Sequence, residues 1–265
     1  MRAQETLTAP SPEPRAVRGL SRRRVGAGSL AALAALVVAG TGNQLSAASA
    51  AASAANLPTL PEGTPASRGG RTSASLVVFG DSITVGGTGW LVSASAPTTS
   101  WLGQLSERCS ASFVYAKSGA TAELLAAAPE PSDAADLAVF AFGTNDLHRG
   151  RTVAQMCADI ERYLAAHLLA SLRGATAVVT VGPRTDASRT RVEGWNRELR
   201  AAASARGWTV LDPWSGLRGS EPAAWADAVL TKDGLHPSEV GARLLGAGYE
   251  REIAWHLAGA TPAAE

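Results

Sequence analysis

Three residues of the chain, Ser82, Asp233 and His236, are of the types that nucleophilic catalysis by serine requires. A serine hydroxyl is a poor nucleophile until a neighbouring base takes its proton, and a histidine base needs a carboxylate that orients the imidazole and stabilises its protonated form. Asp233 and His236 are three residues apart, so a single turn can bring the carboxylate and the imidazole together. The sequence therefore predicts Ser82 as nucleophile, His236 as base and Asp233 as its orienting partner.

Acyl transfer also requires hydrogen-bond donors for the negative oxygen that develops on the substrate carbonyl. The candidate donors are the backbone N–H groups of Ser82 and Gly119 and the side-chain amide of Asn145. Gly119 suits this role because a residue without a Cβ lets a substrate approach the backbone closely. We therefore expect Ser82, Gly119 and Asn145 to form an oxyanion hole.

The same residues also have purely structural interpretations. Ser82 could cap a helix or turn after a strand, Asp233 and Pro237 could mark the start of a helix, and Gly119 could serve a tight turn. Taken together, these roles do not explain why Asn145 and the single His-Pro pair of the chain accompany a serine that follows a strand. We therefore favour the catalytic interpretation.

Short apolar or aromatic segments alternate with longer amphipathic ones beyond residue 74. The predicted strands are residues 75–79, 112–115, 137–142, 175–181 and 208–211. The predicted helices are residues 101–109, 122–127, 152–172, 189–206 and 238–257. Such alternation predicts an α/β domain with a five-stranded parallel sheet and helices on both faces. Ligands bind beyond the carboxyl ends of such strands, where Ser82, Gly119 and Asn145 are expected, and His236 should join them from the last loop.

Four short blocks of the chain resemble those of the SGNH, or GDSL, hydrolases. They are Gly80-Asp81-Ser82-Ile83, Gly119, Gly143-Thr144-Asn145-Asp146 and Asp233-Gly234-Leu235-His236, with Ile83 in place of Leu in the first block. The resemblance covers residues 75–257 and implies a flavodoxin-like three-layer α/β/α sandwich and a serine esterase or lipase without metal or other cofactor. It implies the same roles for Ser82, Gly119, Asn145, Asp233 and His236.

Two predicted loops, residues 85–100 and 212–232, are expected to wall the site. They offer Trp90, Trp214 and Trp225 for substrate binding but few Leu, Ile or Phe residues. A long acyl chain needs a continuous apolar slot, so we expect a short acyl group, such as acetyl on a glycan. The tryptophans could instead pack the domain, because Trp is usually largely buried. A lysophospholipase or short-chain lipase is the alternative activity, and a catalytically inactive envelope-binding domain is the alternative of another class.

The near-balance of charge argues against a nucleic-acid partner. The 265 residues include 24 basic and 23 acidic ones, and no basic cluster is interleaved with aromatic residues. The arginines of residues 184–206 are expected on a solvated helix face. The glycine-rich residues 86–89 lack the ending of a phosphate loop, and the common zinc motifs do not occur. The expected partner is a small-molecule or glycan ester, and we expect a monomer.

The first 50 residues have the order of an export signal. Three arginines at residues 22–24 precede an Ala-, Leu- and Val-rich run at residues 30–39, and small residues follow. The run is shorter than the roughly 20 residues of a membrane-spanning helix, so we expect a cleaved Sec or Tat signal rather than a permanent anchor. Residues 51–74 are expected to form a flexible tether. This organisation predicts an exported hydrolase domain at residues 75–260 without a stable membrane span.

The two cysteines, Cys109 and Cys157, are expected to remain unpaired, although exported proteins with an even number of cysteines usually pair them. Cys109 would end the helix after the first strand, at the sheet edge opposite the site, and Cys157 would begin the helix after the third strand. With strand order 2-1-3-4-5, these helices lie on opposite faces of the sheet. A disulfide requires Cα atoms about 4.4 to 6.8 Å apart, which this arrangement does not allow.

Overall fold

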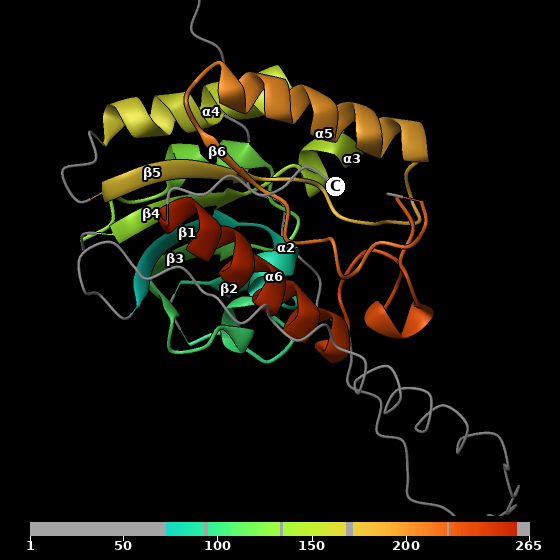
Figure 1. Ribbon diagram of the computed structural model, residues 1–265. Coiled ribbons are helices and arrows are strands. Elements are labelled where there is room, and N and C mark those ends of the chain that lie inside the picture. The colour runs from blue at the N-terminus through green and yellow to red at the C-terminus, as the bar shows by residue number, and fades with distance from the viewer. Residues whose placement is uncertain (1–72, 93–94, 133–134, 168–171, 222, 259–265) are drawn as a thin grey trace, which may run out of the picture. The chain divides into compact units, whose positions relative to one another are not determined.

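Five parallel strands and one short antiparallel strand form the central sheet (Figure 1). The computed structural model describes residues 73–92, 95–132, 135–167, 172–221 and 223–258. The strands are β1 (Ala74–Gly80), β2 (Trp90–Leu91), β3 (Cys109–Lys117), β4 (Ala135–Ala141), β5 (Leu172–Val179) and β6 (Thr209–Leu211). Their order is β2-β3-β1-β4-β5-β6, and only β2 runs antiparallel to its neighbour. The five parallel strands therefore have the predicted flavodoxin-like order 2-1-3-4-5.

Helices cover both faces of the sheet. The α-helices are α2 (Ser82–Val85), α3 (Thr144–His148), α4 (Val153–Ala166), α5 (Arg189–Ser204) and α6 (Glu239–Leu257). The 3-10 helices are η1 (Leu102–Gln104), η2 (Ala122–Ala127) and η3 (Ala228–Leu230). α4 and α5 pack on one face and α6 packs on the other, which confirms the predicted α/β/α sandwich (Figure 1). None of the helices in the described part of the chain is long and apolar enough to cross a membrane.

The strands send alternate side chains into two cores. Phe79 of β1 and Phe140 of β4 face α4 and α5, and their rings stack with centroids 5.0 Å apart. Tyr163 of α4 packs edge-on against Phe79. Val78 of β1 faces the other way, toward Tyr249 of α6. Because each face of the sheet is covered by helices, a strand such as β1 is apolar on both sides rather than alternating with polar residues.

The helix predicted for residues 101–109 does not form. Only the short η1 turn is helical there, and Cys109 already pairs with β1 as the first residue of β3. Trp101 is fully buried and stacks on Tyr249 of α6, with ring centroids 3.7 Å apart. The apolar residues that suggested a helix are therefore held by long-range packing, which overrides local helical preference.

The two cysteines lie in different cores. Cys109 belongs to the core under α6, whereas Cys157 near the start of α4 belongs to the core on the other face, and both are free. The sheet between them accounts for this, although Cys109 begins a strand instead of ending a helix. Burial raises the pKa of Cys109 to about 12 and also raises the pKa of Cys157, so both side chains remain thiols.

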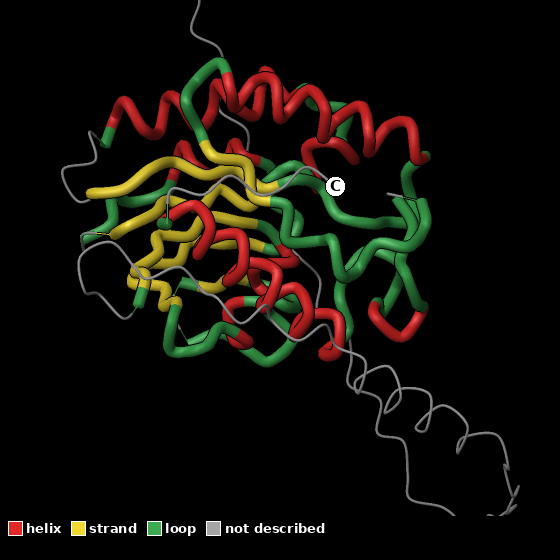
Figure 2. The backbone as a smooth tube through the Cα atoms, in the orientation of Figure 1, coloured by secondary structure: helices red, strands yellow, loops and turns green. Residues whose placement is uncertain are grey.

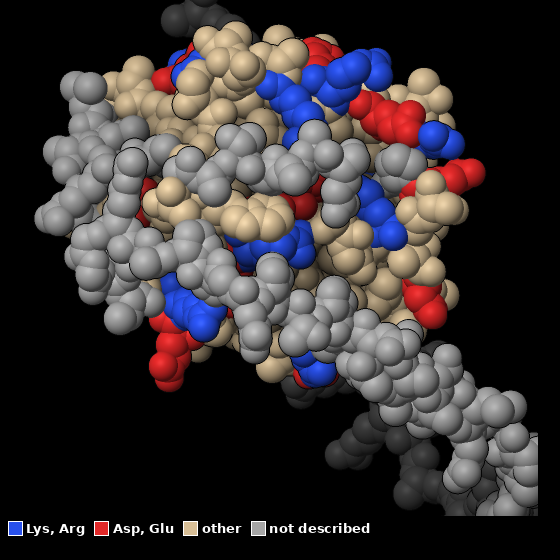
Figure 3. Space-filling view, viewed as in Figure 1, with Lys and Arg blue, Asp and Glu red and all other residues tan. Residues whose placement is uncertain are grey.

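Acidic and basic groups are interspersed on the face shown in Figure 3. On α5, Arg189 pairs with Glu193 at 2.7 Å, and just beyond the helix Arg206 pairs with Glu161 of α4 at the same distance. Such mixed surfaces produce no extended field of one sign.

The predicted signal at residues 1–50 lies outside the described residues, as does nearly all of the predicted tether at residues 51–74. Both therefore remain predictions.

Candidate active site

The loops that follow the strands gather at the side of the sheet where α2 and α3 begin (Figure 2). Ser82 opens α2 directly after β1, with Asp81 as the N-cap residue. Oδ1 of Asp81 accepts the backbone N–H of Ile83 at 3.0 Å, which fixes the turn. A Cβ at Gly80 would lie 2.2 Å from Oγ1 of Thr84, so glycine permits the close return of the chain. This turn holds Ser82 at the carboxyl end of β1.

Ser82, His236 and Asp233 form a continuous chain of hydrogen bonds. Oγ of Ser82 lies 2.9 Å from Nε2 of His236, and Nδ1 of His236 lies 2.8 Å from Oδ2 of Asp233. A carboxylate can only accept a hydrogen bond, so Nδ1 of His236 carries the hydrogen and donates the bond to Asp233. Nε2 is then free to accept a hydrogen bond from the hydroxyl of Ser82. The residues predicted from sequence therefore meet with the geometry of a base held between its orienting group and a nucleophile.

Asp233 also organises the backbone of the turn that carries the base. Its Oδ1 accepts the N–H groups of Leu235 at 3.0 Å and of His236 at 2.8 Å. Burial raises the pKa of Asp233, but hydrogen bonds from the backbone and ring of His236 outweigh it and lower the pKa to about 2. Asp233 is therefore a carboxylate at any pH where a histidine base is neutral.

Gly234 lets this turn close against the loop that follows β5. It has φ 82°, and a Cβ there would lie 2.1 Å from Oγ1 of Thr185. Its carbonyl accepts the backbone N–H of Thr185 at 2.9 Å and the indole N–H of Trp225 at 3.0 Å. Any larger residue at Gly234 would displace the turn that carries Asp233 and His236.

Gly119 and Asn145 lie together beside Ser82. Nδ2 of Asn145 donates to the carbonyl of Ala120 at 2.9 Å and to Oδ2 of Asp81 at 3.4 Å, so the amide bridges the neighbours of Gly119 and Ser82 in the chain. Gly119 has φ 74° in a tight turn after β3. Among the described residues, neither the N–H of Ser82 nor that of Gly119 has a hydrogen-bond acceptor.

Asp81 is a buried carboxyl group next to Ser82. Burial raises the pKa of Asp81 to about 7, and the charge of Asp146 adds to this, whereas the hydrogen bond from Ile83 and the charges of His236 and Arg184 lower it. The sequence does not mark Asp81 as a titrating group. Its residue type alone does not reveal that its side chain is almost fully buried.

A cavity of about 200 Å³ opens at Ser82. Ser82, Asp233 and His236 contribute to its wall, together with residues of α2 and of the loops around it. These further residues are Ile83, Gly86, Gly87, Thr88, Thr99, Ser118, Lys232 and Pro237. The cavity is therefore smaller than the roughly 300 to 1,000 Å³ of common ligand pockets.

The three tryptophans considered for substrate binding have different environments. Trp214 is 3% exposed in the core under α6, and its indole N–H donates to the carbonyl of Thr180 at 2.9 Å. Trp225 is partly buried against Trp214 and bonded to Gly234. Trp90 is 50% exposed, with Nζ of Lys117 4.7 Å from its ring centroid. Trp214 is therefore part of the core and Trp225 is partly buried. The ring of Trp90 is half exposed, with Lys117 over it and Tyr115 packed against it.

Arg184 corrects the expectation that the arginines of residues 184–206 share a solvated face. Its side chain is buried, and Nε and Nη2 each donate to Asp186 at 2.6 Å. Nη1 donates to the carbonyl of Thr144 at 2.8 Å, next to Asn145. Arg184 thus connects the loop after β5 to the turn that carries Asn145. Its position just past an apolar strand is the sequence signal that could have identified it.

The chain is similar to known hydrolases both in sequence and in structure. The family described as GDSL-like Lipase/Acylhydrolase matches residues 78–244. A protein assigned to the lipolytic G-D-S-L family from Desulfitobacterium hafniense has a similar structure, with TM-score 0.51, 17% identity, and coverage of 68% of this chain and 99% of that one. A variant of an acetyl-xylooligosaccharide esterase from Geobacillus Stearmophilus is similar with TM-score 0.50 and 18% identity, covering 69% of this chain and 94% of that one. A comparison with curated proteins finds no match. The chain belongs to the GDSL-like lipase and acylhydrolase family.

Proposed function

We propose that the protein is a serine carboxylic-ester hydrolase that acts through an acyl-enzyme. The observation that carries this proposal is the chain of hydrogen bonds from Asp233 through His236 to Ser82. Beside it lie the backbone N–H groups of Ser82 and Gly119, which have no acceptor in the described part of the chain. A module that only binds has no need for a base placed 2.9 Å from a serine hydroxyl.

The reaction would proceed in two displacements. Oγ of Ser82 attacks the ester carbonyl as its proton passes to Nε2 of His236, and the resulting oxyanion is held by the N–H groups of Ser82 and Gly119 and the amide of Asn145. The tetrahedral intermediate collapses, the C–O bond to the alcohol breaks, and the alkoxide takes the proton from His236. Water then attacks the acyl-serine by the same proton transfers and releases the acid.

The substrate we propose carries a short acyl group, such as an O-acetyl group on a glycan. The small cavity at Ser82 supports this choice, because about 200 Å³ is less than the roughly 300 to 1,000 Å³ of pockets that enclose larger ligands, and a fatty acyl chain needs a longer slot. The half-exposed ring of Trp90 follows shortly after the cavity residues 86–88 in the chain, and a sugar ring could stack on it in place of the Lys117 side chain. We further propose that residues 1–50 direct export of the domain and are then removed.

The test is a series of aryl esters from acetate to octanoate, measured beside release of acetate from an acetylated polysaccharide. We expect turnover to fall as the acyl chain lengthens, and Ser82→Ala to abolish it while the protein stays folded. A fluorophosphonate probe should label the wild type and leave Ser82→Ala unlabelled. A maximum at medium chain length would favour the lipase alternative, and an inert, unlabelled wild type would favour the envelope-binding alternative.

A further inference from the structure

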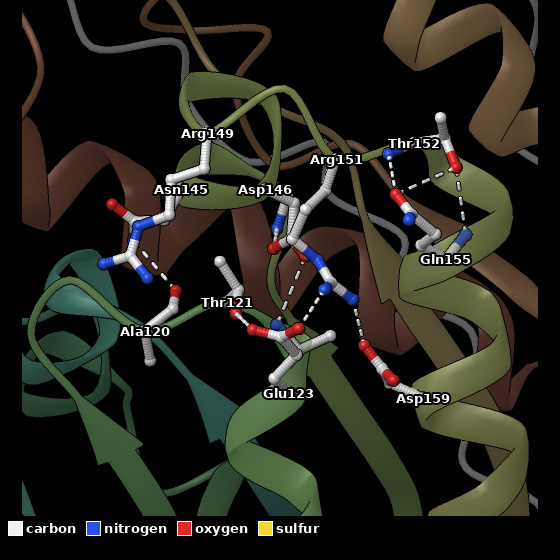
Figure 4. Close-up of polar contacts among 12 residues, drawn as sticks. Ala120, Thr121, Glu123, Asn145, Asp146, Arg149, Arg151, Thr152, Gln155 and Asp159 are labelled. Carbon is white, nitrogen blue, oxygen red and sulfur yellow. Dashed lines mark hydrogen bonds and ion pairs between the residues drawn. The ribbon is translucent and has the colours of Figure 1, made fainter.

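Beside Asn145, a group of charged side chains joins three segments of the chain (Figure 4). The guanidinium of Arg151, in the loop between α3 and α4, points among the carboxylates of Asp146, Glu123 and Asp159. Nε of Arg151 donates to Oδ1 of Asp146 at 2.9 Å, and its two other nitrogens donate to Glu123 of η2 and Asp159 of α4. A single side chain therefore connects η2, α3 and α4.

This group is mostly shielded from solvent. The side chain of Asp146 is fully buried and that of Asp159 is 6% exposed, whereas that of Glu123 is 63% exposed. Burial raises the pKa of Asp146, and hydrogen bonds from Ala122, Arg151 and Gly143 oppose this. Removing one partner of a buried charged pair leaves the charge of the other uncompensated. Asp146 therefore depends on its bond to Arg151 to stay in place as a buried carboxylate.

Asp146 in turn holds the backbone on both sides of the candidate oxyanion hole. Its Oδ1 accepts the N–H of Ala122 and its Oδ2 accepts the N–H of Gly143, both at 3.3 Å. Ala122 follows the Gly119 turn, and Gly143 begins the turn that carries Asn145. The two segments that supply oxyanion donors are therefore joined through one carboxylate.

Glu123 completes the connection on the side of the Gly119 turn. It accepts a bond from the Thr121 hydroxyl at 3.2 Å as well as from Arg151. A separate contact, from Nη2 of Arg149 to the carbonyl of Gly119 at 2.7 Å, acts on the same turn from the end of α3. The distance between the backbone N–H of Gly119 and the side-chain amide of Asn145 thus depends on charged side chains that hydrogen-bond to neither of these two groups.

We propose that Arg151 is a positioning residue that sets the spacing of the oxyanion donors by clamping the Gly119 turn and η2 to the turn that carries Asn145. The inference rests on the proposed function, since it concerns the same reaction. Oxyanion donors act at about 2.7 to 3.1 Å, and misplacement by about 1 Å can reduce a rate by 10²-fold. Loosening this clamp therefore affects the transition state more than the binding of the ester.

Arg151→Lys and Glu123→Gln are the test variants, with Arg162→Met as the matched control. Lys keeps the charge beside Asp146 but cannot reach three carboxylates, and Glu123→Gln breaks the clamp at its exposed end, where folding is least affected. Arg162 also pairs with Asp159 but contacts neither donor segment, and its side chain is 69% exposed. We expect kcat on an aryl acetate to fall about tenfold in Arg151→Lys and less in Glu123→Gln, with KM within about twofold and Arg162→Met unchanged.

A double-mutant cycle with Asn145→Ala separates positioning from general loss of stability. Because Arg151 acts through the donors, Arg151→Lys should reduce kcat much less when the Asn145 amide is already absent. Rates are measured well below the melting temperature of each variant. Unchanged kcat in both clamp variants, an effect on KM alone, or the same loss of kcat with and without Asn145 would overturn the inference. Failure of the proposed function is distinct, because then the wild type itself would not be active.

Discussion

Replacing Asp81 by Asn should change the pH dependence of folding stability. Burial raises the pKa of this carboxyl from 3.8 to about 7, and the side chain is 2% exposed. In Asp81→Asn, Oδ1 can still accept the backbone N–H of Ile83, so the cap of α2 is kept while the titration is removed. Any loss from placing the introduced amide beside the amide of Asn145 would not vary with pH.

The sign and size follow from the two pKa values. Below pH 3.8 the carboxyl is protonated in both states, and between pH 3.8 and 7 it is ionised only when unfolded, so the free energy of unfolding falls as pH rises. A shift of about three pKa units corresponds to about 4 kcal/mol in full. Between pH 5 and pH 9 the wild type should lose about 3 kcal/mol through Asp81 alone, and Asp81→Asn should not.

Urea unfolding followed by tryptophan fluorescence at pH 5, 7 and 9 measures this difference. Asp227→Asn is the matched control, because Asp227 accepts the N–H of Val229 at 2.9 Å in the same kind of turn but is exposed. The advantage of Asp81→Asn over the wild type should grow by about 3 kcal/mol from pH 5 to pH 9. If the two proteins keep a constant difference over this range, the burial argument for Asp81 is wrong.

Four further predictions concern catalysis. Asn145→Ala should lower kcat about 10²- to 10³-fold, the usual loss for one oxyanion donor, and an undiminished kcat would contradict its role. Asp233→Asn should lower kcat about 10⁴-fold with little change in KM, because the imidazole loses its orienting carboxylate. Because the pKa of Asp233 is about 2, protonation of this carboxylate should not lower kcat/KM above about pH 4, and an inflection from it at higher pH, or inhibition by EDTA, would refute the mechanism. Trp90→Ala should raise KM for an acetylated oligosaccharide but not for an aryl acetate, and Trp255→Ala, near the far end of α6, should change neither.

The sequence predicted the elements and residues whose signals are local. Apolar runs such as β1 are typical of strands covered on both faces, and their alternation with helices predicts a parallel sheet. The Asp233 to His236 turn was also predictable, because three residues suffice to bring a carboxylate to an imidazole. The short elements β2, α2, α3 and η3 were not predicted, because two to five residues show no repeating pattern. The helix predicted for residues 101–109 does not form, and Trp101 instead stacks on Tyr249.

Only the tertiary structure decided how the site is supported. Arg184 contacts Thr144 across 40 positions of sequence, and Arg151 contacts Glu123 across 28, so neither pairing has a signal in the local pattern. Burial likewise decided that Asp81 titrates near neutral pH and that Trp214 belongs to the core while Trp90 reaches the surface. The sequence by itself determined which groups could perform the chemistry, because residue type and spacing along the chain carry that information. Their distances, their exposure to water and their supporting charges depend on residues brought together from distant segments, and these only the folded chain determines.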